Sequence, residues 1–313
     1  MFKYHRKDMN IFSIIFLLLL IFYFLLMHDY VKNSAKNYTD SIKDEISMLI
    51  KSKEDDTSVL SKGFASNKKL VEVMKNRDYD RLYGKNFFSI PKAYFSYKNI
   101  RVHVVDENGI QRYFSWTHND LGKNILEDRR DLQELYLNPH SISSISVGRF
   151  GLGIKGIVPI YDEKHKFLGI IETITFFNSI SYKLMKHDIL SAVIIDKKYT
   201  KQLKYPLSKI FINSYNIVNI NIQPEIVNIL KNNLNSSLLN LTNSKYIFKH
   251  NSVFSGYYLV NVPIYNNNEV VIGHYLAFAK DIHHLKQKEY ILDIFIILMG
   301  FLFIWIFFVA FRT

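Results

Sequence analysis

The chain has 313 residues, of which 40 are Lys or Arg and 28 are Asp or Glu, and it has no cysteine. The absence of cysteine excludes a disulfide scaffold, cysteine-ligated metal sites and a cysteine nucleophile. Apolar residues make up 48% of the chain and aromatic residues 15%, which is too much for a disordered protein. The formal net charge of +12 would suit a nucleic-acid partner, but the distribution of the apolar residues argues against one. The length favours two domains.

Two uninterrupted apolar segments lie near the ends of the chain. Ile11–Met27 has 17 residues and Ile294–Phe311 has 18, and neither contains a charged side chain. As helices they would each be roughly 26 Å long, and flanking residues bring them close to the ~30 Å hydrocarbon core of a bilayer. The first segment could be a signal peptide, but it runs straight into Met27-His28-Asp29-Tyr30 without a small-residue cleavage site. We therefore expect two membrane-spanning helices.

The short basic flanks of these segments predict the orientation. Lys3, Arg6 and Lys7 precede the first segment, and Arg312 follows the second. Positive charge in short flanks marks the cytoplasmic side of a membrane. The long region between the spans, His28–Glu289, is then outside the cytoplasm. Because no nucleic acid is available there, we exclude it as a partner.

The region after the first span has helical periodicity. Asp55-Asp56-Thr57 predicts a cap that starts a new helix, and shorter helices follow to about Phe88. Pro91 breaks the pattern. Before the cap, apolar residues recur at spacings of three and four, and part of that face could pack against a second copy of the chain. These positions are Ile42, Ile46, Leu49 and Ile50.

From Ile100 the apolar period changes to two, which is typical of strands. Glu107-Asn108-Gly109 predicts a hairpin turn between the first two strands. The order of two strands, a helix and three strands is that of a PAS-like antiparallel sheet. The strands are expected at 100–106, 110–116, 141–147, 153–161 and 167–177, and the helix at 128–137.

The second half of the outer region repeats a pattern of the first. Val158-Pro159-Ile160-Tyr161 is followed after seven residues by Gly169. Val262-Pro263-Ile264-Tyr265 is followed after seven residues by Gly273, 104 residues further on. The equal spacing predicts an internal duplication.

A second pair of segments agrees with this duplication. Val104-Val105-Asp106 has its counterpart in Ile194-Ile195-Asp196, at an offset of 90 residues. An insertion of 14 residues in the second module reconciles the two offsets. The Asn-rich helical stretch 224–243 lies in the right interval to contain it.

Together, these features resemble the double Cache sensor domains of bacterial receptors, found on sensor kinases, diguanylate cyclases and chemoreceptors. The first module carries the more specific match, and two positions depart from the family pattern: Phe114 replaces an expected Arg, and Ser146 an acidic residue. The matching residues are His103, Asp106, Gly109, Trp116, Gly122, Arg129, the run Gly148-Arg149-Phe150-Gly151-Leu152-Gly153-Ile154-Lys155-Gly156, Pro159, Gly169 and Glu172.

The resemblance implies an α+β fold with a long N-terminal helix and two PAS-like antiparallel-sheet modules, flanked by two transmembrane helices. It also implies a bacterial inner-membrane protein whose region 28–289 is periplasmic. The expected segments are a cytoplasmic tail (1–10), a first span (11–27), a signalling helix with a helical lead-in (28–98), a membrane-distal module (99–187), a membrane-proximal module (188–284), a juxtamembrane helix with the second span (285–311) and a cytoplasmic end (312–313).

No catalytic or metal-binding motif stands out. The eleven histidines are scattered apart from His283-His284, and adjacent helical residues point about 100° apart, so we read that pair as solvated surface. Neither H-x-x-x-H, H-E-x-x-H, G-x-S-x-G nor a P-loop occurs. The glycine-rich run Gly148–Gly156 precedes a strand rather than a helix and is expected to form a turn or bulge. We therefore predict no enzyme activity, no cofactor and no metal.

The candidate ligand-binding residues lie in the first module. In strand 100–106 the alternation places Arg101 and His103 on the face opposite Val102 and Val104. If the valines pack on the long helix, the other face holds the ligand. Aromatic walls with a few cations suit a small anion or carboxylate. The candidates are Arg101, His103, Arg112, Phe114, Trp116, Arg129, Lys155 and Glu172.

A plainer interpretation stays open for each of these residues. Arg112 and Lys155 could be surface charges on a sheet, and Glu172 could simply pair with one of them. The second module offers few polar candidates, so we expect it to be a structural relay.

The predicted function is small-molecule sensing by a membrane receptor whose output module lies outside this chain. We expect an anionic ligand and a parallel homodimer, the usual form of receptors with this resemblance. The alternative is a membrane-anchored binding or assembly protein without a signalling output.

Overall fold

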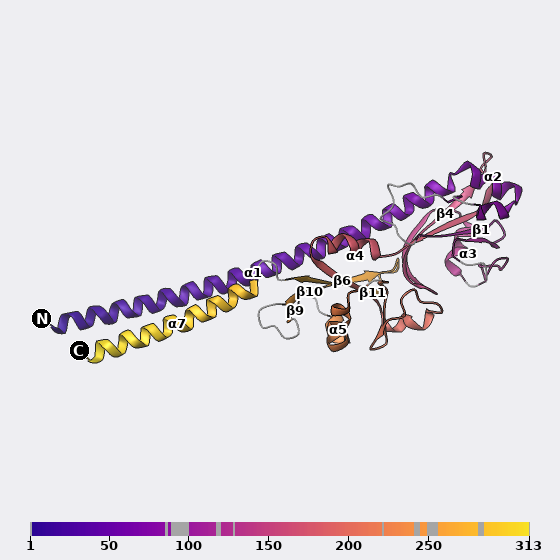
Figure 1. Ribbon diagram of the computed structural model, residues 1–313. Helices are drawn as coiled ribbons and strands as arrows, with labels where there is room; N and C mark the ends of the chain where they lie inside the picture. Colours follow the sequence, from indigo (N-terminus) through magenta and orange to yellow (C-terminus); the bar gives the residue numbers. More distant parts are fainter. Residues whose placement is uncertain are drawn as a thin grey trace. The chain divides into compact units, whose positions relative to one another are not determined.

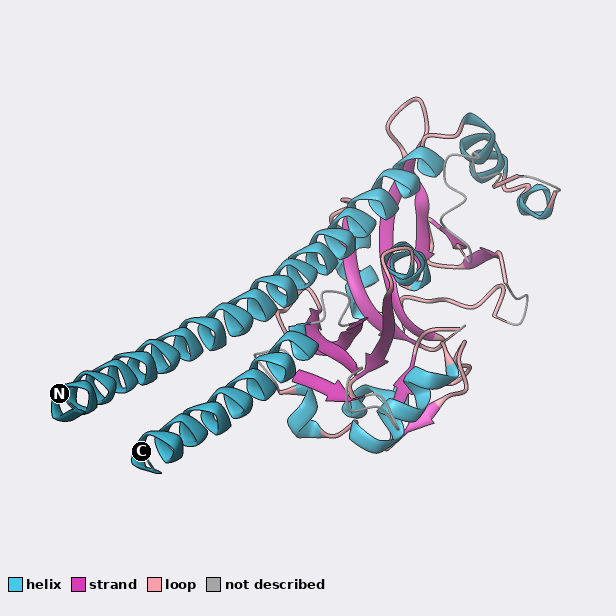
Figure 2. Ribbon diagram, turned by 60° about the vertical axis from the view of Figure 1, so that its left-hand side comes forward, coloured by secondary structure: helices cyan, strands magenta, loops and turns pink. Residues whose placement is uncertain are grey.

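The computed structural model describes residues 2–84, 87–88, 100–116, 120–127, 129–220, 222–240, 245–248, 256–280 and 285–312. The chain is an α+β protein with a long N-terminal helix and two antiparallel sheets (Figures 1 and 2). It divides into two compact units, which differ from the predicted modules: residues 1–43, 243–260 and 278–313 form the first, and 44–242 with 261–277 form the second. The module boundaries stay predictions. Pro91 and His283-His284 lie outside the described residues.

The helices are α1 (Phe2–Ala65), α2 (Lys68–Asn76), α3 (Arg130–Leu137), α4 (Asn178–Met185), α5 (Pro224–Asn233), α6 (Ser236–Leu239) and α7 (Leu285–Arg312), with short 3-10 helices η1 (Tyr79–Tyr83) and η3 (Lys197–Gln202). The first sheet has the order β2-β1-β5-β4-β3, from β1 (Arg101–Asp106), β2 (Gln111–Phe114), β3 (Ile142–Gly148), β4 (Gly151–Tyr161) and β5 (Phe167–Thr175). The second has the order β7-β8-β6-β11-β10-β9, from β6 (Ile189–Ile195), β7 (Phe211–Ile212), β8 (Tyr215–Ile217), β9 (Lys245–Phe248), β10 (Gly256–Tyr265) and β11 (Val271–Lys280).

Two helices are long and apolar enough to cross a membrane. The described parts that pass this test are Ile14–Ala65 within α1 and Lys288–Phe307 within α7. Within the first unit the two helices run side by side, and the rings of Tyr23 and Phe295 lie 6.4 Å apart (Figure 2). Their apolar side chains are largely exposed, with Leu18 at 60% and Leu298 at 61%. Apolar surface of this extent is what a lipid environment would cover.

The predicted cap at Asp55-Asp56-Thr57 is wrong, because α1 continues to Ala65 without a break. The Thr57 hydroxyl donates to the carbonyl of Lys53 at 2.7 Å, one turn earlier, instead of capping a new helix. The same hydroxyl lies 2.7 Å from the Thr175 hydroxyl on β5. A Thr in a helix interior can satisfy its hydroxyl in this way, so its presence does not fix a helix start.

Part of the apolar stripe on α1 is covered within the chain itself. Ile42 is 2% exposed and Ile46 0% exposed, whereas Leu49 and Ile50 are partly exposed. The expectation that part of this face packs against a second copy stays a prediction. Asn33, Asn37 and Asp40 are exposed on the same helix.

One face of the first sheet packs against α1 and α2. Val102 and Val104 belong to a buried cluster that includes Leu60 and Phe64 of α1, as the alternation predicts. Gly156 on β4 makes the closest approach. A Cβ placed there would lie 2.4 Å from Ser61 Oγ, and the Ser61 hydroxyl donates to the Gly156 carbonyl oxygen at 3.0 Å. The opposite face of the sheet is free to carry polar residues.

The hairpins β4–β5 and β10–β11 have the same turn. Asp162 accepts hydrogen bonds from the amides of Lys164 and Lys166 through its side chain. Asn266, 104 residues later, accepts the equivalent bonds from Asn268 and Val270. The residues at the left-handed position of the two turns, His165 and Glu269, each have φ of 58°. The duplicated segments therefore occupy equivalent hairpins.

The glycines of the duplicated pattern have equivalent environments. A Cβ on Gly169 would lie 2.1 Å from the Val105 carbonyl oxygen of β1, and one on Gly273 would lie 2.5 Å from the Ile194 carbonyl oxygen of β6. In both modules the main chain of the first strand approaches so closely that only glycine fits. Of the glycine-rich run, only Arg149 and Phe150 form the expected turn, between β3 and β4, whereas Gly151–Gly156 belong to β4.

Candidate functional site

The face of the first sheet that points away from α1 gathers most of the candidate residues. The register pairs His103 of β1 with Phe114 of β2 on one side and Glu172 of β5 on the other. One step along the strands, Arg101 is opposite Ile174, which is opposite Lys155 of β4. We call this set of side chains, with Trp116 and Arg129, the distal face.

Glu172 is the centre of a buried ion network on the distal face. Its Oε2 lies 3.1 Å from His103 Nδ1, and its Oε1 lies 3.3 Å from Arg129 Nη1 and 3.6 Å from Lys155 Nζ. The side chains of His103 and Glu172 are each 3% exposed. Arg129 also pairs with Asp131, its Nε donating to Oδ1 at 2.8 Å. The cations of this network therefore already have anionic partners.

Burial and these partners set the protonation states. Burial lowers the pKa of His103, although Glu172 opposes the shift, so the ring is neutral at pH 7. Burial alone would raise the pKa of Glu172, but Arg129 and Lys155 hold it well below its usual range. Burial lowers the pKa of Lys155. Since Nδ1 of His103 faces a carboxylate it carries the proton, which leaves Nε2 as a bare acceptor.

Arg101 lies in an aromatic enclosure beside this network. Its guanidinium carbon is 4.2 Å from the centroid of the Phe150 ring, 5.1 Å from that of Trp116 and 5.7 Å from that of Phe176. Burial lowers the pKa of Arg101. Cation–π contacts stabilise a partly desolvated guanidinium but satisfy none of its N–H donors. Among the described residues no carboxylate pairs with it.

Four polar atoms on the distal face are buried and have no hydrogen-bond partner within the described part of the chain. Three are the donors Arg101 Nη1 and Trp116 Nε1 and the acceptor His103 Nε2. The fourth is Ser146 Oγ, on β3 opposite Gly153, which can act as donor or acceptor. Buried polar groups are nearly always hydrogen-bonded, because an unmet one costs roughly 1–3 kcal/mol. Several buried polar atoms without hydrogen-bond partners on one face suggest a binding site for a polar ligand.

Arg112 is not part of this face, contrary to the expectation that it shares a side of its strand with Phe114 and Trp116. The pairing of β1 with β2 shifts at a bulge between Val104 and Val105, which displaces Arg112 from the regular alternation. Its Nε donates to Asp106 Oδ2 at 2.7 Å, and its guanidinium carbon is 4.7 Å from the Tyr79 ring.

Phe114 and Trp116 are aromatic walls of the distal face. The ring of Phe114 stacks on His103 at 4.3 Å, with an angle of 9° between the planes. Trp116 meets Phe114 edge-on at 5.0 Å. Three residues that contact the distal face were not predicted from the sequence: Asp131, which pairs with Arg129, and Phe150 and Phe176, which enclose Arg101. Phe150 lies inside the matched glycine-rich motif, which could have pointed to it, whereas Phe176 and Asp131 carry no such signal.

A cavity of about 450 Å³ lies in the second module, which we had expected to be a structural relay. None of its lining residues belongs to the distal face. Within the residues that the structure describes, no group of three or more His, Asp or Glu could hold a metal ion.

Comparison with known proteins gives structural likenesses only. No family model matches the chain, and no curated protein matches it. The sensor domain of the V. cholerae histidine kinase DctB aligns at 14% identity over 80% of this chain and 98% of its own, with a TM-score of 0.42. The sensory domain of the Campylobacter jejuni chemoreceptor Tlp3, with isoleucine bound, aligns at 12% identity over 84% and 97%, with a TM-score of 0.41.

The ligand-binding domain of the Pseudomonas aeruginosa PAO1 amino acid chemoreceptor PctC, in complex with GABA, aligns at 12% identity over 78% of this chain and 99% of its own. Its TM-score is 0.42. All three of these matched chains are sensory or ligand-binding domains of receptors.

Proposed function

We propose that this chain is the sensory part of a bacterial receptor in the cytoplasmic membrane, with residues 28–289 in the periplasm. The observation that carries the proposal is Arg101, a half-buried guanidinium enclosed by three aromatic rings and without an anionic partner among the described residues. A cation kept in this state has lost much of its hydration and gained no charge partner. Binding an anion there would supply that partner.

The ligand that suits the distal face is a small carboxylate with a hydrogen-bond donor of its own. Its carboxylate would accept from Arg101 and from the indole N–H of Trp116, both now unmet. Its donor, a hydroxyl or amino group, would meet the bare Nε2 of His103. One buried water could satisfy some of these atoms instead, but water would leave the charge of Arg101 unpaired.

The two sides of the sheet connect the ligand to the long helix. Lys155 of the distal face precedes Gly156, whose carbonyl accepts from Ser61 of α1 on the other side of the sheet. Thr175, three residues after Glu172, shares a hydrogen bond with Thr57 of α1. A ligand that shifts β4 and β5 would therefore act directly on α1, by as much as its affinity differs between two states.

Transmission inward and a parallel homodimer belong to this proposal. Since Ile42 and Ile46 are covered within the chain, a dimer through this helix would use its partly exposed and exposed positions. These are Leu49, Ile50, Asn33, Asn37 and Asp40. The cytoplasmic output would lie outside this sequence, and the chain itself would not be an enzyme.

Thermal shift of the full chain in lipid nanodiscs tests the proposal. We expect small hydroxy- or amino-carboxylates to raise the melting temperature, and uncharged sugars to leave it unchanged. Arg101→Gln should weaken the bound carboxylate about ten- to a hundredfold, because a charge-assisted hydrogen bond contributes roughly 1.5–3 kcal/mol. Arg81→Gln, which removes an exposed guanidinium paired with Glu72, is the matched control and should bind normally.

The alternative is a membrane-anchored assembly protein without a ligand. It predicts no stabilisation by any carboxylate of the panel and a distal face that holds only water. Equal binding by Arg101→Gln and the parent chain would also contradict the assignment of Arg101 as the anion-binding residue.

A further inference from the structure

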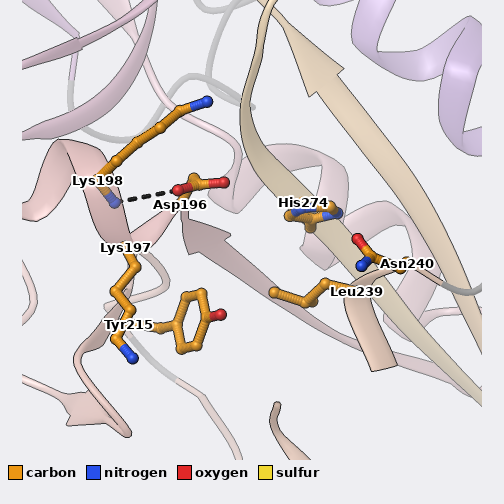
Figure 3. Close-up of a pocket in the computed structure, with 7 residues that line it drawn as sticks. All are labelled: Asp196, Lys197, Lys198, Tyr215, Leu239, Asn240 and His274. Carbon is orange, nitrogen blue, oxygen red and sulfur yellow. Dashed lines mark hydrogen bonds between the residues drawn. The ribbon is translucent and has the colours of Figure 1, made fainter. Parts of the chain in front are cut away.

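The second module contains a cavity of about 450 Å³ that the proposed function does not use. Its walls come from the end of β6, from η3, β8 and β11, and from the end of α6 (Figure 3). The lining residues are Asp196, Lys197, Lys198, Tyr215, Leu239, Asn240 and His274. Tyr215, Leu239 and His274 are buried, whereas Lys197 and Asn240 are exposed and form the rim. The volume is ample for a small organic molecule.

Both lysines belong to the lining and suggest an anion site by their charge, but neither ammonium group lies between Asp196 and His274. In Figure 3 the side chain of Lys198 extends away from this space, and its Nζ lies 5.0 Å from the Tyr199 ring. Lys197 lies at the rim beside Tyr215, with its Nζ 5.6 Å from the centroid of that ring. The space between Asp196 and His274 is therefore not occupied by either ammonium group.

The interior of the cavity instead presents hydrogen-bond acceptors. Asp196 accepts from the Lys198 amide with one carboxylate oxygen at 3.0 Å, and among the described residues no cation pairs with this carboxylate. Figure 3 shows its other oxygen on the side of the His274 ring. A carboxylate that is half-buried and has no cation beside it attracts a positive group.

A chain of hydrogen bonds fixes His274 as a second acceptor. Asn261 Nδ2 donates to the Leu239 carbonyl at 2.7 Å, which orients the amide so that its oxygen faces His274 Nδ1 at 3.0 Å. An amide oxygen only accepts, so Nδ1 carries the proton. Burial lowers the pKa of His274, although Asp196 opposes the shift, and the ring is neutral at pH 7. Nε2 is therefore a lone-pair acceptor, and no described group donates to it.

We infer that this cavity is a second binding site, which takes a small molecule with a protonated primary amine. The ammonium group would donate to the free oxygen of Asp196 and to Nε2 of His274. The aliphatic part would lie against Tyr215 and Leu239, which give the cavity its apolar wall. This site does not depend on the distal face, and each could exist without the other.

A series of four-carbon probes tests the charge preference on the unmodified chain in nanodiscs by calorimetry. n-Butylamine carries only the ammonium group, butanoate only the carboxylate, and 4-aminobutanoate both. Binding of butylamine identifies a simple amine as sufficient. If 4-aminobutanoate binds and butylamine does not, the ligand class is an amino acid, whose ammonium group still occupies the site. Absence of binding by both compounds overturns the inference.

Variants assign the binding to the cavity. Asp196→Asn keeps the hydrogen bond to the Lys198 amide and removes the charge, so it should weaken amine binding at least tenfold. Asp162→Asn is the matched control, because Asn266 accepts the same turn hydrogen bonds at the equivalent position of the second module. It should bind the amine like the parent chain. Unchanged binding by Asp196→Asn contradicts the site.

Lys197→Gln provides a second test that does not involve Asp196. It should not weaken butylamine binding, because it removes a positive charge from the rim rather than a group that binds the ammonium. Butanoate binding that this variant abolishes would show that the cavity recognises anions, and would overturn the inference. Butanoate binding that Arg101→Gln abolishes belongs to the distal face, so failure of either site can be recognised separately.

Discussion

Glu172 is the residue on which most of the distal face depends. Three basic side chains, His103, Arg129 and Lys155, converge on one carboxylate that is almost completely buried. A buried ion network of this kind is a poor guide to net stability, because desolvation offsets much of the Coulomb attraction. Removing one member is different, since the remaining charges stay buried without their partner.

Glu172→Gln is expected to destabilise the protein by about 3–5 kcal/mol, because Arg129 and Lys155 lose their shared counter-charge. The measurement is the melting temperature of the full chain in nanodiscs. Glu163→Gln is the matched control, since Glu163 has a side chain that is 76% exposed and, among the described residues, forms an ion pair with the exposed Lys75 alone. Its melting temperature should match that of the parent.

Acid provides a second readout of the same carboxylate. Because the pKa of Glu172 is lowered in the fold, its contribution to stability is present above the unfolded pKa of about 4.3 and is lost as the pH falls through the folded pKa. Glu172→Gln should lack this part of the acid sensitivity. Melting temperatures that match the parent at every pH would contradict the role of Glu172 as the centre of the network.

The sequence predicted which residues lie on the distal face more accurately than it predicted what they contact. Alternation in strand 100–106 placed Arg101 and His103 on the correct side, because period two is a local property of a strand. Arg112 was misplaced because a bulge depends on the pairing of two strands. The cavity around His274 was missed because its walls come from five separate elements, and no local pattern marks them.

At the scale of elements, the contact between α1 and β4 depends on the absence of a side chain at Gly156. Ser61 and Thr57 direct polar groups into the sheet at this point rather than apolar ones. The helix is thus joined to β4 and β5 by specific hydrogen bonds as well as by the apolar cluster around Leu60. Such bonds fix the register of the helix along the sheet.

Gly156→Ala is expected to destabilise the fold by about 1–3 kcal/mol, because the added methyl group would lie 2.4 Å from the Ser61 hydroxyl and 2.9 Å from the Thr57 carbonyl oxygen. Gly148→Ala on β3 is the matched control, since its Cβ would meet no atom within 4 Å. Equal melting temperatures for the two variants would show that α1 does not press on β4 here.

Element prediction succeeded where periodicity alone decides and failed where side chains have two options. The strands and the helix of the first module were expected within a few residues of β1 to β5 and α3. The break expected at Asp55-Asp56-Thr57 did not occur, because capping residues can equally bond within a continuing helix.

At the scale of the whole molecule, the two helices that are long and apolar enough to cross a membrane make the proposed topology testable. Reporter fusions after Lys7 and after Thr313 should read cytoplasmic, and an insertion near Asn235, in the short connection between α5 and α6, should read outside. The basic flanks of the two spans are the physical reason. A cytoplasmic signal near Asn235 would contradict the topology and, with it, the receptor proposal.

Arg101, which pairs with no carboxylate in the described part of the chain, has a consequence under the proposed function for the balance between stability and ligand response. A charged group that is desolvated before its ligand binds lowers the stability of the ligand-free protein. The ligand-bound protein would gain stability at the same site where the ligand-free protein loses it. Any ligand that binds only the folded state shifts the folding equilibrium toward that state. The lifetime of the protein in the membrane would then depend on the ligand concentration, because ligand-free molecules would be degraded sooner than ligand-bound ones.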